Sequence, residues 1–225
     1  TFPFVTSGLP IIGRPATNLC VKAYRLLKKD FPNLPSVRIY LHKIIPSGAG
    51  LGGGSADGAF VLKMINEMFV LELAKEQLIK YALQLGSDCP FFIINKPCFA
   101  TGRGEKLEEV TLDLSAYKIV IVNPGIHIDT ESAFFNITPA LPEHSIKKII
   151  ATPIEKWKGN LKNDFENSVF SQHREILDIK DKLYQLGALY ASMSGSGSTV
   201  FGIFPKDKKM NLSFTLTYFV KELHS

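Results

Sequence analysis

A glycine-rich run of eleven residues, from Pro46 to Ala56, carries the clearest chemical signal in the sequence. It reads Pro-Ser-Gly-Ala-Gly-Leu-Gly-Gly-Gly-Ser-Ala, and five of its residues are glycine. Because glycine has no side chain, an incoming group can approach the backbone N–H groups. Glycine also reaches the positive φ angles at which successive N–H groups converge on an anion. Ser55 offers a hydroxyl to a phosphate oxygen or to Mg²⁺. The run therefore predicts a cradle for a polyphosphate.

The segments on either side of the run strengthen this prediction. Val37–Leu41 is strand-like and Ala56–Asn66 is helix-like. A helix that begins directly after the loop adds its unpaired first N–H groups and the positive end of its dipole to the cradle. The alternative without a ligand is a turn that packs a helix closely on a sheet. In that case so many adjacent glycines would carry an entropic cost without use.

Two common nucleotide signatures fit the run poorly. A Walker-type loop ends in Gly-Lys-Ser/Thr, whereas this run contains no lysine. Gly48, Gly50 and Gly53 match the spacing of a dinucleotide fingerprint. The acidic residue expected about twenty positions later should follow a second strand, but Glu72 comes just after a helix-like stretch.

A second candidate segment reads Gly-Ser-Asp-Cys-Pro-Phe-Phe and extends from Gly86 to Phe92. Asp88 follows a predicted helix and precedes a short apolar stretch that we expect to be a buried strand. A carboxylate in this place could accept the proton of a substrate hydroxyl. The alternative is an Asx-turn residue that closes a loop, because aspartate after Gly-Ser is common in turns.

A third candidate segment, Ser192–Ser198, reads Ser-Met-Ser-Gly-Ser-Gly-Ser between two predicted strands. Its small side chains would let this loop approach the glycine-rich run and line a cleft. A plain flexible hairpin turn explains the same composition.

Composition sets the broad class of protein. The chain has 225 residues, of which 45% are hydrophobic and 21% charged, with a net charge of +5. These values are typical of a globular protein with a sizeable core, and the positive charge suits an anionic ligand. Its basic residues are scattered, which disfavours a nucleic-acid surface. We find no membrane span and no signal peptide, and we expect a cytoplasmic protein. Three cysteines without Cys-x-x-Cys spacing (Cys20, Cys89 and Cys98) indicate neither a disulfide framework nor a zinc site.

Hydrophobic periodicity and turn residues predict an α+β protein with two lobes that meet near residue 115. We expect domains over residues 1–115 and 116–225. The expected helices are 18–29, with Asn18 as N-cap, 56–66, 75–85, ending at Gly86, 145–150 and 172–186. The expected strands are 37–41, 89–94, 117–122, 189–193 and 199–204, with a turn at 102–104 and a loop at 138–142.

Taken together, the three segments resemble the GHMP kinase superfamily. The glycine-rich run is similar to the family's Pro-x-x-x-Gly-Leu-Gly-Ser-Ser-Ala loop, in a Gly-Leu-Gly-Gly-Gly-Ser variant. Gly86–Phe92 resembles the Gly-Ala-Asp-Val-Pro-Phe-Phe segment of one member, and Met193–Gly197 resembles the third motif of the superfamily. Asn18–Ala23, which reads Asn-Leu-Cys-Val-Lys-Ala, also fits a helix start of the family.

The resemblance implies a two-lobed fold with the active site in the cleft between the lobes. It implies ATP-dependent phosphorylation, with Mg²⁺, of the 2-hydroxyl in a cytidine diphosphate derivative of methylerythritol, a step of non-mevalonate isoprenoid (terpenoid) synthesis. By resemblance, Asp88 is the base and Ser55 also serves Mg²⁺. Asn18 and Lys43 line the adenine pocket, although Lys43 could equally be a solvated lysine at a strand end. Ser194, Gly195 and Ser196 lie near the acceptor. The remaining residues assigned to ATP are Pro46, Ser47, Gly48, Ala49, Gly50, Leu51, Gly52, Gly53, Gly54, Ser55 and Ala56.

Two motifs of this family have no counterpart in the sequence. They are a Pro-x-Ala-Lys-x-Asn-like motif with a catalytic lysine, and a Gly-Tyr-His segment that recognises cytidine. We therefore expect the natural enzyme to be longer, and this chain to be impaired without those residues.

Two other functions remain open. A different GHMP kinase, acting on homoserine, mevalonate or a sugar, would share the glycine-rich run, but the segment around Asp88 argues against it. A non-enzymatic nucleotide-binding or RNA-binding module would show no phosphoryl transfer and a salt-sensitive affinity for RNA. For the kinase, we expect a small-molecule partner, no nucleic acid or membrane, and a monomer or homodimer.

Overall fold

The structure, a computed structural model, describes residues 3–11, 13–135, 137 and 144–224. The chain divides into two compact units. The first contains Thr1–Ser47 and Gly52–Thr111, and the second contains Gly48–Leu51 and Leu112–Ser225. The glycine-rich run therefore contributes to both units, because its residues 48–51 pack with the second.

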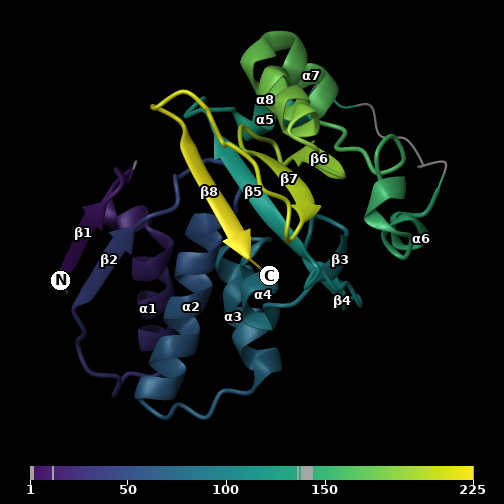
Figure 1. Cartoon of the computed structure of the whole chain (residues 1–225). Helices are drawn as coiled ribbons and strands as arrows, with labels where there is room; N and C mark the ends of the chain where they lie inside the picture. The colour runs from purple at the N-terminus through teal and green to yellow at the C-terminus, as the bar shows by residue number, and fades with distance from the viewer. Residues whose placement is uncertain (1–2, 12, 136, 138–143, 225) are drawn as a thin grey trace. The chain divides into compact units, whose positions relative to one another are not determined.

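Among the described residues, four helices and two strand pairs build the first unit (Figure 1). The helices are α1 (Leu19–Asp30), α2 (Gly53–Met68), α3 (Lys75–Leu85) and α4 (Cys89–Ile94), with a short 3₁₀ turn η1 (Pro15–Thr17) before α1. The strands are β1 (Phe4–Gly8), β2 (Ile39–Lys43), β3 (Cys98–Thr101) and β4 (Lys106–Glu109). β1 pairs with β2 in parallel, and β3 pairs with β4 in an antiparallel hairpin. The helices pack on one another around a core that includes Leu27, Leu62 and Ala82.

Local sequence signals explain where the helices of the first unit begin and end. The Asn18 side chain accepts a hydrogen bond from the Cys20 N–H, which caps α1. α3 ends at Gly86, and the turn of the β3–β4 hairpin contains Gly102 and Gly104 at positive φ. The predicted N-cap of α1, both predicted ends of α3, and the predicted turn at 102–104 are confirmed.

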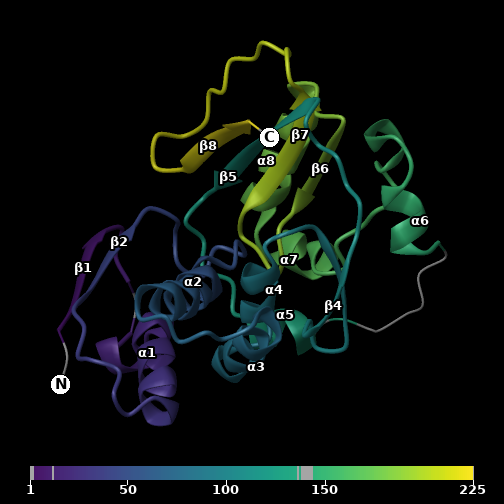
Figure 2. The ribbon, with the colours of Figure 1, turned by 90° about the horizontal axis from the view of Figure 1, so that it is seen from below.

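A four-stranded antiparallel sheet in the order β6-β7-β5-β8 forms the centre of the second unit (Figure 2). Its strands are β5 (Tyr117–Asn123), β6 (Tyr190–Met193), β7 (Val200–Pro205) and β8 (Phe219–His224). The helices are α5 (Thr130–Phe135), α6 (Ile146–Ile150), α7 (Glu166–Gln172) and α8 (Arg174–Gln185), with a 3₁₀ turn η2 (Ile154–Lys156). α8 packs on β6 and β7 through apolar residues that include Ile176 and Leu183. The structure confirms three predicted strands, 117–122, 189–193 and 199–204, and two predicted helices, near 145–150 and 172–186. The ends of these elements differ from the predicted ends by no more than two residues.

One predicted element is wrong. We expected Cys89–Ile94 to be a buried strand, but it is the helix α4. A six-residue apolar run does not separate a strand from a buried helical turn, so the flanking residues decide. Pro90 stands in the first turn, where its missing N–H is tolerated, and Asn95 ends the helix in the left-handed conformation. The predicted loop at 138–142 lies outside the described residues.

Among the residues that the structure describes, no helix has both the length and the apolar character needed to cross a membrane.

Candidate active site

The glycine-rich run joins β2 to α2 through residues of alternating conformation. Gly48, Gly50 and Gly52 have positive φ angles of 68°, 75° and 64°. Gly52 is the N-cap of α2, which therefore begins at Gly53, three residues earlier than we predicted. Its carbonyl accepts the N–H of Ala56 at 2.9 Å. In an α-helix the N–H groups of the first turn have no partner within the helix, so those of residues 53–55 are candidates for binding an anion.

The start of α2 leaves space for a ligand at Gly54. A Cβ atom placed on Gly54 would meet nothing within 4 Å, and this residue is exposed. The neighbouring positions are closed: a Cβ on Gly52 would lie 2.9 Å from the Phe92 ring, and one on Gly53 would lie 3.2 Å from the Lys43 Nζ. An incoming group can therefore reach the backbone at Gly54.

A partly buried ion pair lies beside this helix start. The Lys43 ammonium, at the end of β2, lies 2.5 Å from the Asp57 carboxylate in the second turn of α2. Only 4% of Lys43 is exposed, so the alternative interpretation of Lys43 as a solvated lysine is wrong. Asn18 belongs to the same unit and uses its Oδ1 to cap α1, which leaves its amide NH₂ group as the side-chain donor.

The two buried cysteines near these residues, Cys20 and Cys89, are not reactive thiols. Burial, followed by the charge of Asp57, raises the pKa of Cys20 to about 12. Burial also raises the pKa of Cys89, against the opposing effect of a side-chain hydrogen bond with Ser55. Both thiols are therefore protonated at neutral pH, and neither is poised as a nucleophile.

Asp88 immediately precedes α4 and is exposed. Its carboxylate lies against the turn of the β3–β4 hairpin, because a Cβ on Gly104 would stand 3.7 Å from Asp88 Oδ1. The adjacent residue, Cys89, shares a hydrogen bond with the Ser55 side chain. The first unit thus brings an accessible carboxylate and the serine of the glycine-rich run to the same neighbourhood.

The other half of the run, residues 48–51, is held by the Ser/Gly loop after β6. The Ser194 hydroxyl donates a hydrogen bond to the Gly50 carbonyl at 2.8 Å, and the Thr199 N–H donates to the Ala49 carbonyl at 3.2 Å. A Cβ on Gly50 would stand only 2.1 Å from the Ser194 carbonyl oxygen, so only glycine fits at this contact. The predicted approach of the two loops is confirmed.

The remaining predicted acceptor residues lie in the same loop. Gly195 is exposed, and the Ser196 hydroxyl lies 3.3 Å from the hydroxyl of Thr130, at the start of α5. Ser194 itself is committed to the Gly50 carbonyl.

The predicted residues therefore fall into two groups. The first unit brings together Asn18, Lys43, Pro46, Ser47, Gly52–Ala56 and Asp88, and the second brings together Gly48–Leu51 and Ser194–Ser196. The predicted roles of these residues, and the predicted site between two lobes, stay predictions.

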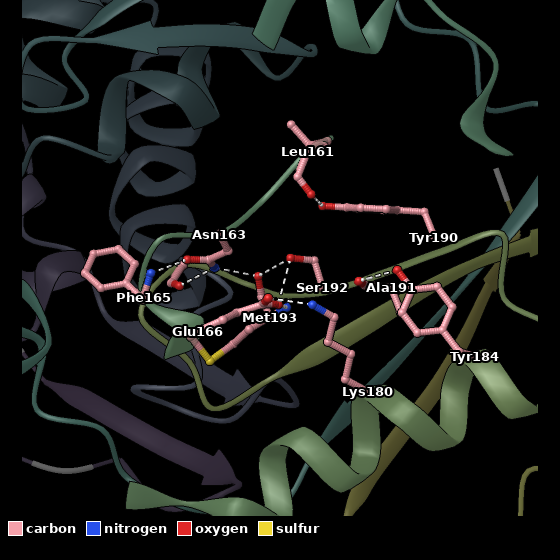
Figure 3. Close-up of polar contacts among 11 residues, drawn as sticks. Leu161, Asn163, Phe165, Glu166, Lys180, Tyr184, Tyr190, Ala191, Ser192 and Met193 are labelled. Atoms are coloured by element: carbon pink, nitrogen blue, oxygen red, sulfur yellow. Dashed lines mark hydrogen bonds and ion pairs between the residues drawn. The ribbon is translucent and has the colours of Figure 1, made fainter. Parts of the chain in front are cut away.

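Sequence reasoning missed two polar residues beneath the Ser/Gly loop. Asn163 donates to the carbonyls of Met193 and Gly195, and Glu166 accepts from the Met193 N–H (Figure 3). Their only local signal is the Asn-x-x-Glu spacing, which by itself is typical of a helix start.

Comparison with known proteins identifies the class. The family description "GHMP kinases N terminal domain" matches residues 18–96, and "GHMP kinases C terminal" matches residues 146–212. These two matches include the glycine-rich run, Asp88 and the Ser/Gly loop. The chain belongs to the GHMP kinases, a family of ATP-dependent kinases, and the predicted α+β fold of that family is confirmed.

Individual relatives indicate which kinases of the family this chain is similar to. The 4-diphosphocytidyl-2-C-methyl-D-erythritol kinase of Bacteroides fragilis is 54% identical over 213 residues, which cover 94% of this chain and 77% of the relative. A crystal structure of 4-(cytidine 5'-diphospho)-2C-methyl-D-erythritol kinase superposes with a TM-score of 0.71 at 30% identity, over 90% of this chain and 73% of the other. A homoserine kinase from Cytophaga hutchinsonii has a TM-score of 0.58 at 17% identity, over 92% of this chain and 72% of the other, and shows the fold alone.

Proposed function

We propose that this protein transfers the γ-phosphoryl group of ATP to the 2-hydroxyl of 4-diphosphocytidyl-2-C-methyl-D-erythritol, in isoprenoid synthesis. The observation that carries the proposal is the open start of α2 at Gly54, in the same unit as an accessible carboxylate, Asp88. The relatives at 54% and 30% identity, both named as kinases of this compound, support the choice of substrate.

The start of α2 fits a triphosphate. Gly54 leaves open space where a side chain would otherwise stand, and the first N–H groups of α2 point toward that end of the helix. No lysine of the Walker type accompanies this run. Backbone N–H groups and the helix dipole would therefore carry most of the protein's contribution to phosphate binding.

Mg²⁺ fits this site only as a partner of the bound phosphates. Within the part of the chain that the structure describes, no group of three or more histidine, cysteine, aspartate or glutamate side chains could hold a metal ion. Mg²⁺ is commonly held by one or two protein oxygens together with substrate phosphates, and the Ser55 hydroxyl would supply one such oxygen. When bound, the ion would neutralise charge on the transferred phosphoryl group.

Asp88 has the simplest catalytic role. Its exposed carboxylate would accept the proton of the acceptor hydroxyl while that oxygen forms its bond to phosphorus. α4 and the β3–β4 turn would hold the carboxylate in place. Positioning of the two reacting groups would supply most of the rate enhancement, as is usual for phosphoryl transfer.

Two further groups of residues would bind the rest of the substrates. The Oδ1 of Asn18 already caps α1, so its amide NH₂ would donate to an adenine ring nitrogen. Lys43 would hold the start of α2 beside the adenine through its ion pair with Asp57. The hydroxyls of Ser196 and Thr130, with the exposed Gly195, would contact the acceptor. Ser194 would act by holding Gly50 in place.

The test is an acceptor panel with a matched pair of variants. We expect Mg-ATP to phosphorylate 4-diphosphocytidyl-2-C-methyl-D-erythritol in preference to homoserine, mevalonate or galactose, as read by mass spectrometry of the product. Asp88→Asn should lower kcat by roughly 10²- to 10⁴-fold. Asp113→Asn removes the carboxylate of an exposed aspartate elsewhere in the chain and should have no effect. Transfer to another acceptor would replace the proposed substrate, and equal rates in the two variants would remove Asp88 from the reaction.

A further inference from the structure

A cluster of polar side chains lies beneath the Ser/Gly loop and surrounds the peptide groups of Met193 (Figure 3). Glu166, the first residue of α7, is only 8% exposed. Its Oε1 accepts hydrogen bonds from the Ser192 hydroxyl at 3.1 Å and from the Met193 N–H at 2.9 Å, and its Oε2 lies 2.5 Å from the Lys180 ammonium. Both oxygens of this carboxylate are therefore engaged, one by Ser192 and Met193 and the other by Lys180.

Asn163 holds the other side of the same backbone. Its Nδ2 donates to the Met193 carbonyl at 2.7 Å and to the Gly195 carbonyl at 2.8 Å. Its Oδ1 accepts the Phe165 N–H at 3.0 Å, which fixes the side chain at the start of α7. Asn163 and Glu166 therefore hold both the N–H and the carbonyl of Met193, and we call these two residues the clamp.

The clamped backbone leads directly to the glycine-rich run. Ser194, the next residue, donates its N–H to the Thr199 carbonyl at 2.8 Å and its hydroxyl to the Gly50 carbonyl at 2.8 Å. The Thr199 N–H in turn donates to Ala49. Ser194 therefore links the backbone that the clamp holds, at Met193, to the glycine-rich run, which we assign to the phosphates.

Stability alone does not explain this cluster. A largely buried carboxylate–ammonium pair such as Glu166 and Lys180 is weak evidence for net stability, because desolvation offsets much of its attraction. Three hydrogen bonds to the backbone of Met193 and Gly195, together with a fourth to the Ser192 hydroxyl, in contrast, select one conformation of the Ser/Gly loop.

We propose that Asn163 and Glu166 are positioning residues of the kinase site. They fix the Ser/Gly loop so that Ser194 holds the Gly50 carbonyl, and this contact sets the conformation of residues 48–51 for nucleotide binding. The nucleotide part of the proposal rests on the proposed function. The clamp itself concerns two loops that both belong to the second unit.

Asn163→Asp is the most discriminating variant. It keeps the size of the side chain and the Oδ1 acceptor for Phe165, but it removes the NH₂ group that donates to Met193 and Gly195. If Asn163 only shaped the chain before α7, aspartate would replace it without effect. Asn160→Asp is the matched control, because Asn160 also donates from Nδ2 to a carbonyl, but that carbonyl belongs to Lys156, outside the Ser/Gly loop, and Asn160 is exposed.

Two measurements on the full chain test the clamp. The first is amide hydrogen exchange in peptides that cover residues 48–51 and 193–199. The second is the Kd for Mg-ATP by calorimetry. We expect Asn163→Asp to accelerate exchange in both peptides and to raise the Kd roughly tenfold, which corresponds to about 1.4 kcal/mol. The control should change neither quantity, and faster exchange at 193–199 without faster exchange at 48–51 would overturn the proposed link.

A second pair of variants covers the case in which Asn163→Asp fails to fold. Glu166→Gln keeps one acceptor oxygen for Met193 and Ser192, so it should disturb the two peptides less than Glu166→Ala does. Equal effects of glutamine and alanine would overturn the assigned role of Glu166. If the unsubstituted chain bound no Mg-ATP, the proposed function would fail. Hydrogen exchange would still show whether the clamp fixes the two loops.

Discussion

The two halves of the glycine-rich run differ in their contacts with the rest of the chain. Residues 48–51 are held by hydrogen bonds from Ser194 and Thr199, and Gly50 leaves no room for a side chain. At Gly54, in contrast, the start of α2 faces open space. We call these the held half and the open half. We therefore propose that one half serves as scaffold and the other receives the ligand, although both halves contain several glycines.

The strongest test of the held half is Gly50→Ala. A Cβ would meet the Ser194 carbonyl oxygen at 2.1 Å and would sit on a residue with a φ of +75°. We expect a loss of roughly 3 kcal/mol in the free energy of unfolding, from overpacking together with backbone strain, measured by urea denaturation. Gly159→Ala is the control, because Gly159 has a φ of +83° but nothing within 4 Å of the added Cβ. It should lose only about 1 kcal/mol, and equal losses would mean that the contact with Ser194 is unimportant.

Alkaline pH should lower the free energy of unfolding through a buried tyrosine of the second unit, the unit that contains the held half. Burial raises the pKa of Tyr190 from 10.0 to about 12. Because the folded pKa is raised, this contribution to stability is complete below pH 10 and is lost as the pH rises toward 12. We expect Tyr190 to steepen the fall in the free energy of unfolding by up to about 1.4 kcal/mol per pH unit in that window.

Tyr190→Phe should flatten this part of the pH profile. Tyr40→Phe, which changes a tyrosine that is 66% exposed in the first unit, should leave it as steep as in the unsubstituted chain. Identical profiles for the two variants would show that burial of Tyr190 does not control the loss.

Gly54→Ala tests the open half and should have opposite effects on stability and binding. Alanine has the higher helix propensity and meets no neighbour here, so we expect stability to rise by about 0.5–1 kcal/mol. The added methyl group would occupy the space assigned to a phosphate, so we expect the Kd for Mg-ATP to rise roughly tenfold, about 1.4 kcal/mol. Calorimetry and urea denaturation measure the two quantities. Unchanged affinity would mean that phosphates do not approach Gly54.

The glycine-rich run and the helix after it were predictable from the sequence, because their signals are local, although α2 begins three residues earlier than predicted. Adjacent glycines, a following helix and Ser55 all lie within eleven residues. The N-cap Asn18 and the terminating Gly86 predicted helix ends in the same way. Cys89–Ile94 was mistaken for a strand because its length suits either structure, and the helix signals of Pro90 and Asn95 outweighed its apolar run.

The detailed contacts of the held half were not predictable, because they join distant parts of the chain. Ser194 and Gly50 are 144 residues apart, and Asn163 reaches Gly195 across 32 residues. The sequence could suggest that two loops of small residues approach each other. It could not show that Ser194 would be committed to a carbonyl, or that Asn163 and Glu166 would hold it there.

The most direct test of the central claim is thermal unfolding of this chain with and without saturating Mg-ATP. A ligand at about 100 times its Kd stabilises the folded state by roughly 2.7 kcal/mol, which corresponds to a rise in Tm of roughly 5 to 10 °C for a chain of this size. We predict that rise for the unsubstituted chain and a smaller one for Gly54→Ala, with Mg²⁺ alone causing neither. A cooperative transition at the same Tm with and without Mg-ATP would contradict the assignment of the glycine-rich run as a nucleotide site.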